Sequence, residues 1–198
     1  MKLNLVTGVL VLSSTLMMGQ ALAEDGTVHF RGEVTDSTCK VDPASADQYV
    51  DLHKVSTSGL TGQTERTTSP TPFDIKLTDC PAVFKNATVV FDGTEDQDAA
   101  GKGYLAIGSG GAPVNDGTHP SGDFTGDPLP VAAATGVAIK ITNRSDRSVV
   151  GLFNPSLPAD ITGGSATLSF LAQYVSTKDT VTPGTGNADS QFTVTYSK

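Results

Sequence analysis

The sequence predicts an all-β protein, an antiparallel sandwich built from about seven short strands. Several short segments alternate apolar and polar residues, which is the period of a half-buried strand. Glycine occurs 21 times and proline 11 times, and these residues separate the segments. No stretch repeats its apolar residues with the period of a helix. A sandwich of immunoglobulin-like type is therefore favoured, with a β-barrel as the alternative.

The amino terminus has the features of an export signal. The positively charged Lys2 precedes a mostly apolar run, which ends in the small residues of a signal-peptidase site. We expect cleavage between Ala23 and Glu24, which makes residues 1–23 a signal peptide. A retained membrane anchor is the weaker alternative, because the run is shorter and more interrupted than a spanning helix of roughly 20 residues.

The exported chain would begin with an alternating strand. Apolar or small residues occupy one face of this segment, and polar residues occupy the other. The residues of the first face are Val28, Phe30, Gly32 and Val34. A terminal strand of this kind either belongs to the sheet of its own domain or adds to the sheet of another molecule. The alternation alone leaves both interpretations open.

The chain has two cysteines, Cys39 and Cys80. In an oxidising compartment an even number of cysteines predicts a disulfide bond. A metal pair and a reactive thiol are the alternatives. Both are disfavoured, because neither cysteine lies in a CxxC motif or at zinc-ligand spacing from a histidine.

Further segments alternate or run apolar between turn residues, and we expect each to form a strand. They are residues 49–55, 73–77, 87–91, 104–107, 137–141, 168–174 and 192–196. Residues 101–130 are otherwise rich in glycine, proline, aspartate and serine, which predicts long surface loops rather than a linker. We expect one domain, because a β domain of this length does not need to divide.

The charge of the chain excludes two kinds of partner. The formal net charge is −8 at pH 7. Nucleic acids and anionic lipid surfaces bind proteins through positive charge that displaces counterions. We therefore expect no nucleic-acid partner and no insertion into a membrane.

Catalytic and metal-binding motifs are absent from the sequence. The histidines His29, His53 and His119 lie in unrelated contexts, and each reads as a surface residue rather than a general base. GxSxG, HExxH and P-loop motifs do not occur. The acidic residues 92–98 lack the ligand spacing of an EF-hand, so a solvated turn is favoured over a calcium site. We expect a protein that is not an enzyme and has no catalytic residues, cofactor or metal.

Four motifs in this order resemble the pilin subunits that the chaperone-usher pathway of Gram-negative bacteria assembles. They are GTVHFRGEV followed by Cys39, FDIKLTDC ending in Cys80, LSFLAQY, and GTGNADSQFTVTY. The similarity is strongest to the major subunits of type 1 fimbriae and spans residues 26–196. Residues 95–130 lack an obvious counterpart. Several spaced motifs in the right order are more specific than any one of them.

The resemblance implies an incomplete immunoglobulin-like sandwich that lacks its last strand. In this family a periplasmic chaperone first lends the missing strand, and the amino-terminal extension of another subunit then replaces it at an outer-membrane usher. On this basis residues 24–38 are a donor-strand extension and residues 39–198 are the pilin domain. The donor residues are Val28, Phe30, Gly32 and Val34, with Gly32 where the acceptor groove is shallow. The product is a fimbria on the cell surface, and a homopolymer is expected.

The carboxyl terminus carries a second family motif. The family has a penultimate tyrosine and a glycine twelve residues before it, which correspond here to Tyr196 and Gly184. With Phe192 and Val194, these residues are expected to form the strand that borders the groove and docks to the chaperone. The chain ends Tyr-Ser-Lys, one residue longer than the usual form, so the way in which the carboxylate of Lys198 meets the chaperone departs from the family pattern.

Three other functions are alternatives to a major fimbrial subunit. A minor or adaptor pilin would carry the same assembly signals and differ in the groove that it prefers. A fimbrial adhesin involved in cell adhesion would need a separate receptor domain, for which the chain is too short. An enzyme or small-ligand binder on a sandwich would need a convergent polar site, which the sequence does not show.

Overall fold

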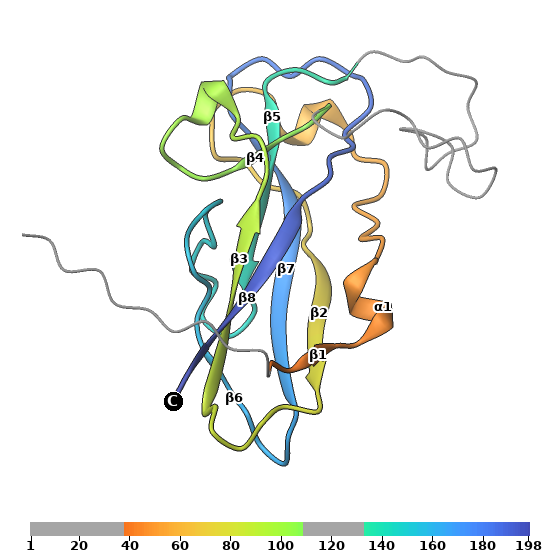
Figure 1. Ribbon diagram of the computed structural model, residues 1–198. Helices are drawn as coiled ribbons and strands as arrows, with labels where there is room; N and C mark the ends of the chain where they lie inside the picture. The colour runs from red at the N-terminus through yellow and green to blue at the C-terminus, as the bar shows by residue number, and fades with distance from the viewer. Residues whose placement is uncertain (1–37, 109–132) are drawn as a thin grey trace, which may run out of the picture. The chain divides into compact units, whose positions relative to one another are not determined.

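Two antiparallel sheets face each other in the computed structural model, which describes residues 38–108 and 133–198 (Figure 1). The strand order is β1-β2-β7-β5-β4 in one sheet and β6-β3-β8 in the other. The strands are β1 (Lys40–Val41), β2 (Thr71–Thr78), β3 (Asn86–Asp92), β4 (Leu105–Ala106), β5 (Val137–Asn143), β6 (Ala159–Asp160), β7 (Ala166–Ser176) and β8 (Gln191–Ser197). All pairs between these strands are antiparallel. The predicted sandwich is confirmed.

The longer strands place alternate side chains between the sheets. β7 is the centre of its sheet, where Phe170 is paired with Phe73 of β2 and Ala172 with Ile141 of β5. In the other sheet β3 pairs with β8 in a register that sets Val89 opposite Val194. Because side chains alternate across a strand, these registers direct one face of each long strand into the core.

Two buried phenylalanines, Phe91 and Phe170, and the partly buried Phe73 pack together in the core. The ring of Phe170 is 5.3 Å from that of Phe73 and 5.1 Å from that of Phe91, centre to centre. Phe170 and Phe91 meet edge to face, an arrangement that aromatic quadrupoles favour. These rings join β2, β7 and β3, so they connect both sheets. They supply the large apolar volume of a core that has no tryptophan.

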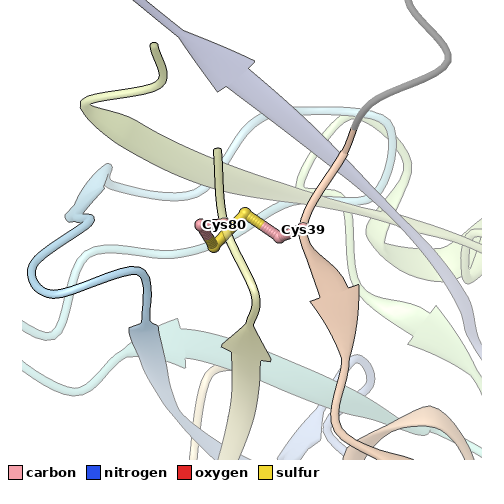
Figure 2. Close-up of a disulfide and its surroundings, with 2 residues drawn as sticks. All are labelled: Cys39 and Cys80. Carbon is pink, nitrogen blue, oxygen red and sulfur yellow. A yellow bond between two sulfur atoms is a disulfide. The ribbon is translucent and has the colours of Figure 1, made fainter. Parts of the chain in front are cut away.

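The disulfide bond joins Cys39 to Cys80, as expected. Figure 2 shows that Cys39 lies just before β1 and Cys80 just after β2. Both residues are buried in the main core cluster. The bond therefore fixes the start of the described chain to the end of a long core strand.

Most strand predictions are confirmed, but residues 49–55 are a correction. This segment forms no strand, although Val50 and Leu52 pack against the core. The side chain of Asp51 accepts a hydrogen bond from the backbone N–H of His53 at 2.7 Å, and His53 has a φ of 59°. A short turn of this kind interrupts the extended backbone that a strand needs.

The described residues contain one α-helix, which the sequence pattern did not indicate. α1 (Pro43–Ala46) has only four residues. Asp42 caps it by accepting a hydrogen bond from the N–H of Ala44, and proline at its start has a backbone angle suited to a helix. The described part of the chain has no helix that is both long and apolar enough to span a membrane.

Several predictions lie outside the described residues. They are the cleavage site at Ala23 and Glu24, the donor residues Val28, Phe30, Gly32 and Val34, His29 and His119, and residues 109–130 of the predicted surface loops.

Candidate strand-acceptor site

The carboxyl-terminal strand β8 is at the edge of its sheet. It pairs with β3 on one side, and no strand pairs with its other side within residues 38–108 and 133–198. Figure 1 shows β8 and β3 side by side in front of β7. An edge strand presents backbone N–H and C=O groups to which a further strand can bind. We call this side of β8 the acceptor edge.

The core is less complete beneath β8 than beneath β3. The inward side chains of β8, those of Phe192, Val194 and Tyr196, are only half-buried, although all three pack against the core. Their partners in the register are Phe91, Val89 and Ala87 of β3, with exposed fractions of 4%, 0% and 0%. Directly paired residues lie on the same face of a sheet. The core-facing surface therefore becomes exposed toward the acceptor edge.

A second segment presents half-buried apolar side chains to the same core. Val50 and Leu52 belong to residues 48–56, which form no strand, and they pack against the core cluster that also includes Phe192 and Val194. The hydroxyl of Thr71 in β2 donates a hydrogen bond to the carbonyl of Asp51 at 2.9 Å. Residues 48–56 are thus held to one sheet, while β8 belongs to the other.

Tyr196 connects the end of β8 to the disulfide segment. Its ring stacks on that of Phe84, with the centres 4.9 Å apart. A hydrogen bond joins its hydroxyl to the backbone of Cys39. Burial raises the pKa of Tyr196, and this hydrogen bond offsets part of the rise. Tyr196 therefore packs against the core and lies on β8, the strand at the acceptor edge.

Gly184 lies apart from the other residues predicted in the carboxyl-terminal motif. It is exposed and precedes β8 in a bend of the chain. Two residues later, Gly186 contacts Tyr174 of β7, whose hydroxyl donates a hydrogen bond to the carbonyl of Gly186 at 3.1 Å. The sequence motif contains both glycines and the LSFLAQY segment contains Tyr174, but no local pattern links residues on different elements.

Carboxylates of the acidic residues 92–98 bind donor groups of the protein itself. Glu95 accepts a hydrogen bond from the N–H of Gly103 at 2.7 Å, and Asp98 lies 2.8 Å from Nζ of Lys178. Asp96 caps a short 3₁₀ helix. Among the described residues, no three His, Cys, Asp or Glu side chains come together as metal ligands. His53 lies at the surface, with its Nδ1 3.1 Å from the carboxylate of Asp51.

A polar network lies around Glu65. Its carboxylate accepts hydrogen bonds from Lys102 at 2.6 Å and from the hydroxyl of Tyr104 at 2.7 Å, and Lys140 is 3.8 Å away. Burial alone would raise the pKa of Glu65, but these hydrogen bonds and the two positive charges outweigh it and lower the pKa. The network joins the loop before β2 to the region of β4 and β5.

The sequence profile described as "Fimbrial protein" matches residues 28–197. The chain therefore belongs to the fimbrial protein family. It is 36% identical over 193 residues to the type-1 fimbrial protein, A chain, of Escherichia coli strain K12, covering 96% of this chain and 94% of that protein. It is 34% identical over 173 residues to the probable major fimbrial subunit LpfA of Escherichia coli O157:H7, covering 87% and 84%.

Solved structures show the same fold. A subunit of a chaperone-usher pilus matches with a TM-score of 0.57 and 22% identity, over 93% of this chain and all of that one. The P pilus rod subunit PapA matches with a TM-score of 0.57 and 20% identity, over 81% of this chain and all of that one. The chain is a structural fimbrial subunit, exported to form an extracellular fibre, in a family of structural proteins rather than enzymes.

Proposed function

We propose that the chain polymerises by donor-strand exchange, with the acceptor edge of β8 receiving the amino-terminal strand of another copy. The observation that carries this proposal is the contrast across one sheet. The inward residues of β8 are half-buried, whereas their partners on β3 have at most 4% of their surface exposed. A strand added beside β8 would supply the missing cover.

The donor in this proposal is the segment 24–38. Val28, Phe30 and Val34 would enter the core beside β8, each contributing roughly 1.5 to 3 kcal/mol if fully buried. Gly32 would lie where the site is shallow. Backbone hydrogen bonds to β8 provide affinity, and the alternate side chains provide the register. Residues 1–23 are a signal peptide in this account, and residues 39–198 form the accepting domain.

A periplasmic chaperone would occupy the acceptor edge before assembly, and an outer-membrane usher would be the place of exchange. An isolated subunit with an uncovered edge strand is prone to aggregation, so a partner is needed from the moment of export. Phe192, Val194 and Tyr196 border the edge that the chaperone would cover. Gly184 lies upstream of this strand, and Lys198 lies beyond it.

The test is deletion of residues 24–38 with the signal peptide retained. The variant should still bind its chaperone, because the acceptor edge is intact, but it should form no fibre, because it has no strand to donate. Chaperone copurification and electron microscopy of the cells measure the two properties. A deletion variant that forms normal polymers would overturn the proposal.

A matched control separates the donor role from a general requirement for the segment. The double substitution Thr27→Ser and Thr35→Ser changes the polar face of the same segment and leaves its apolar face intact. This control should form fibres of normal length. Loss of fibres in the control as well would show that the whole segment, rather than its apolar face, is required.

A further inference from the structure

The contact between Tyr174 and Gly186 lies where the chain enters β8. Tyr174 belongs to β7 in one sheet, and Gly186 precedes β8 in the other. The ring of Tyr174 packs against both the main core cluster and a smaller cluster around Leu60, Val137 and Val181. Its hydroxyl donates to the carbonyl of Gly186 at 3.1 Å. The hydrogen bond therefore joins the central strand of one sheet to the approach of β8.

Only glycine permits this contact. A Cβ built on Gly186 would lie 2.5 Å from the hydroxyl oxygen of Tyr174 and 2.7 Å from the carbon that bears it. Real Cβ atoms essentially never come this close to another heavy atom. Gly186 has no positive φ, so the requirement for glycine comes from the ring against it and not from backbone strain.

The residues beside Gly186 are held by backbone hydrogen bonds. The carbonyl of Thr185 accepts from the N–H of Ala134 at 2.9 Å, and the carbonyl of Asn187 accepts from the N–H of Gly108 at 2.7 Å. Ala188 packs against the core. With the Tyr174 hydrogen bond, three successive carbonyls before β8 have fixed partners, so the position of the chain entering β8 is determined.

Tyr174 packs against the same core cluster as Val50 and Leu52 of residues 48–56. The negative charge of Asp51 acts on its hydroxyl, and together with burial it raises the pKa of Tyr174. Thr68, in the chain before β2, accepts a hydrogen bond from the backbone N–H of Tyr174 at 3.1 Å. Tyr174 is thus bonded both to the approach of β8 through Gly186 and to the chain before β2 through Thr68.

We propose that the Tyr174–Gly186 contact forms the closed end of the strand-acceptor site and sets the register in which an incoming strand pairs with β8. This inference rests on the proposed function. Within the part of the chain that the structure describes, β8 has a strand on only one side, so its position toward the acceptor edge depends on its ends. Tyr196 holds one end through Phe84 and Cys39, and Tyr174 holds the other. A strand that slipped toward Gly186 would meet the ring of Tyr174.

The experiment measures register directly. The chaperone-bound subunit is mixed with a synthetic peptide of residues 24–38 in which Arg31, on the polar face, is replaced by cysteine. The subunit carries a single added cysteine at Thr193 or Thr195, which lie on the exposed face of β8. The ratio of disulfide cross-linking at these two positions reports the register, since neighbouring positions on one face are two residues apart.

Three backgrounds are compared with the wild type. Tyr174→Phe keeps the ring and removes the hydroxyl, Gly186→Ala forces the ring to move, and Gly59→Ala is the matched control, at an exposed glycine where an added Cβ meets nothing within 4 Å. We expect one position to dominate in the wild type. The ratio of cross-linking at the dominant position to that at the other should fall about fivefold in Tyr174→Phe, which corresponds to one lost hydrogen bond, fall further in Gly186→Ala, and stay unchanged in Gly59→Ala.

The outcomes separate this inference from the proposed function. If the wild-type subunit captures no peptide, donor-strand acceptance fails and the inference fails with it. If the wild type captures the peptide and the ratio in Tyr174→Phe equals that of the wild type, only the register role is overturned. Tyr174→Phe decides the question even where Gly186→Ala does not fold. Thermal unfolding of the chaperone-bound variants separates a change of register from a general loss of stability.

Discussion

Cys39 and Cys80 hold the first described residues against the end of β2 (Figure 2). Because the same backbone at Cys39 also bonds the hydroxyl of Tyr196, the disulfide supports one end of the acceptor edge. The effect of the bond on stability thus extends to the strand at which assembly is proposed.

Replacement of the bridge should lower the amount of subunit in the periplasm. For Cys39→Ser together with Cys80→Ser, we expect a loss of about 4 kcal/mol of unfolding free energy, the value of a loop of this length on the chain-entropy model. Immunoblotting of periplasmic fractions and copurification with the chaperone measure the effect. Unchanged accumulation and chaperone binding would show that the bridge is dispensable.

Glu65 predicts a dependence of stability on acidity. Its pKa in the folded protein is lowered, so its network stabilises the fold above the unfolded pKa of about 4.3 and loses this contribution as the pH falls through the lower folded pKa. The variant Glu65→Gln lacks this carboxylate, so it is the reference against which the wild type is measured. In urea unfolding of the chaperone-bound subunit, the free energy of unfolding of the wild type should exceed that of Glu65→Gln at pH 7. This difference should shrink below pH about 4. An advantage that stays constant between these pH values would contradict the assignment.

At the scale of elements, β8 is the strand whose two faces should respond differently to charge. Val194 faces the core and is half-buried, whereas Thr193 is exposed and pairs with Val90. Val194→Asp should prevent capture of the 24–38 peptide, because the carboxylate would be buried without a partner once a strand is added. Thr193→Asp is the matched control and should capture the peptide nearly as well as the wild type. Peptide capture by both variants, measured from displacement of the chaperone, would contradict the placement of the site.

The elements also show what sequence can and cannot predict. The alternation of Phe73, Ile75 and Leu77 predicted β2, because both the pattern and the pairing with β7 depend on the same period of two. Residues 49–55 have a similar composition, but the turn made by Asp51 and His53 prevents a ladder. The role of Gly186 was missed because it depends on Tyr174, a residue of another element, which no local pattern connects to it.

At the scale of the whole molecule, one chain carries both halves of a repeating contact. Residues 24–38 supply the proposed strand, and β8 at the opposite end of the sequence supplies the edge that receives it. A contact between two different surfaces of identical subunits builds an open filament wherever the rotation between subunits does not close it into a ring. This property suits a fimbrial subunit, because one such contact, repeated, builds a fibre.

The most direct test of this account uses intact subunits in assembled fibres. A single chain carries cysteine in place of Arg31 on its donor strand and of Thr193 or Thr195 on β8, and the fibres are oxidised and separated on a non-reducing gel after denaturation. We predict a ladder of covalent oligomers, because each donor strand lies beside β8 of a different subunit. Cross-linked monomers would instead show that residues 24–38 pair with β8 of their own chain, and would contradict donor-strand exchange.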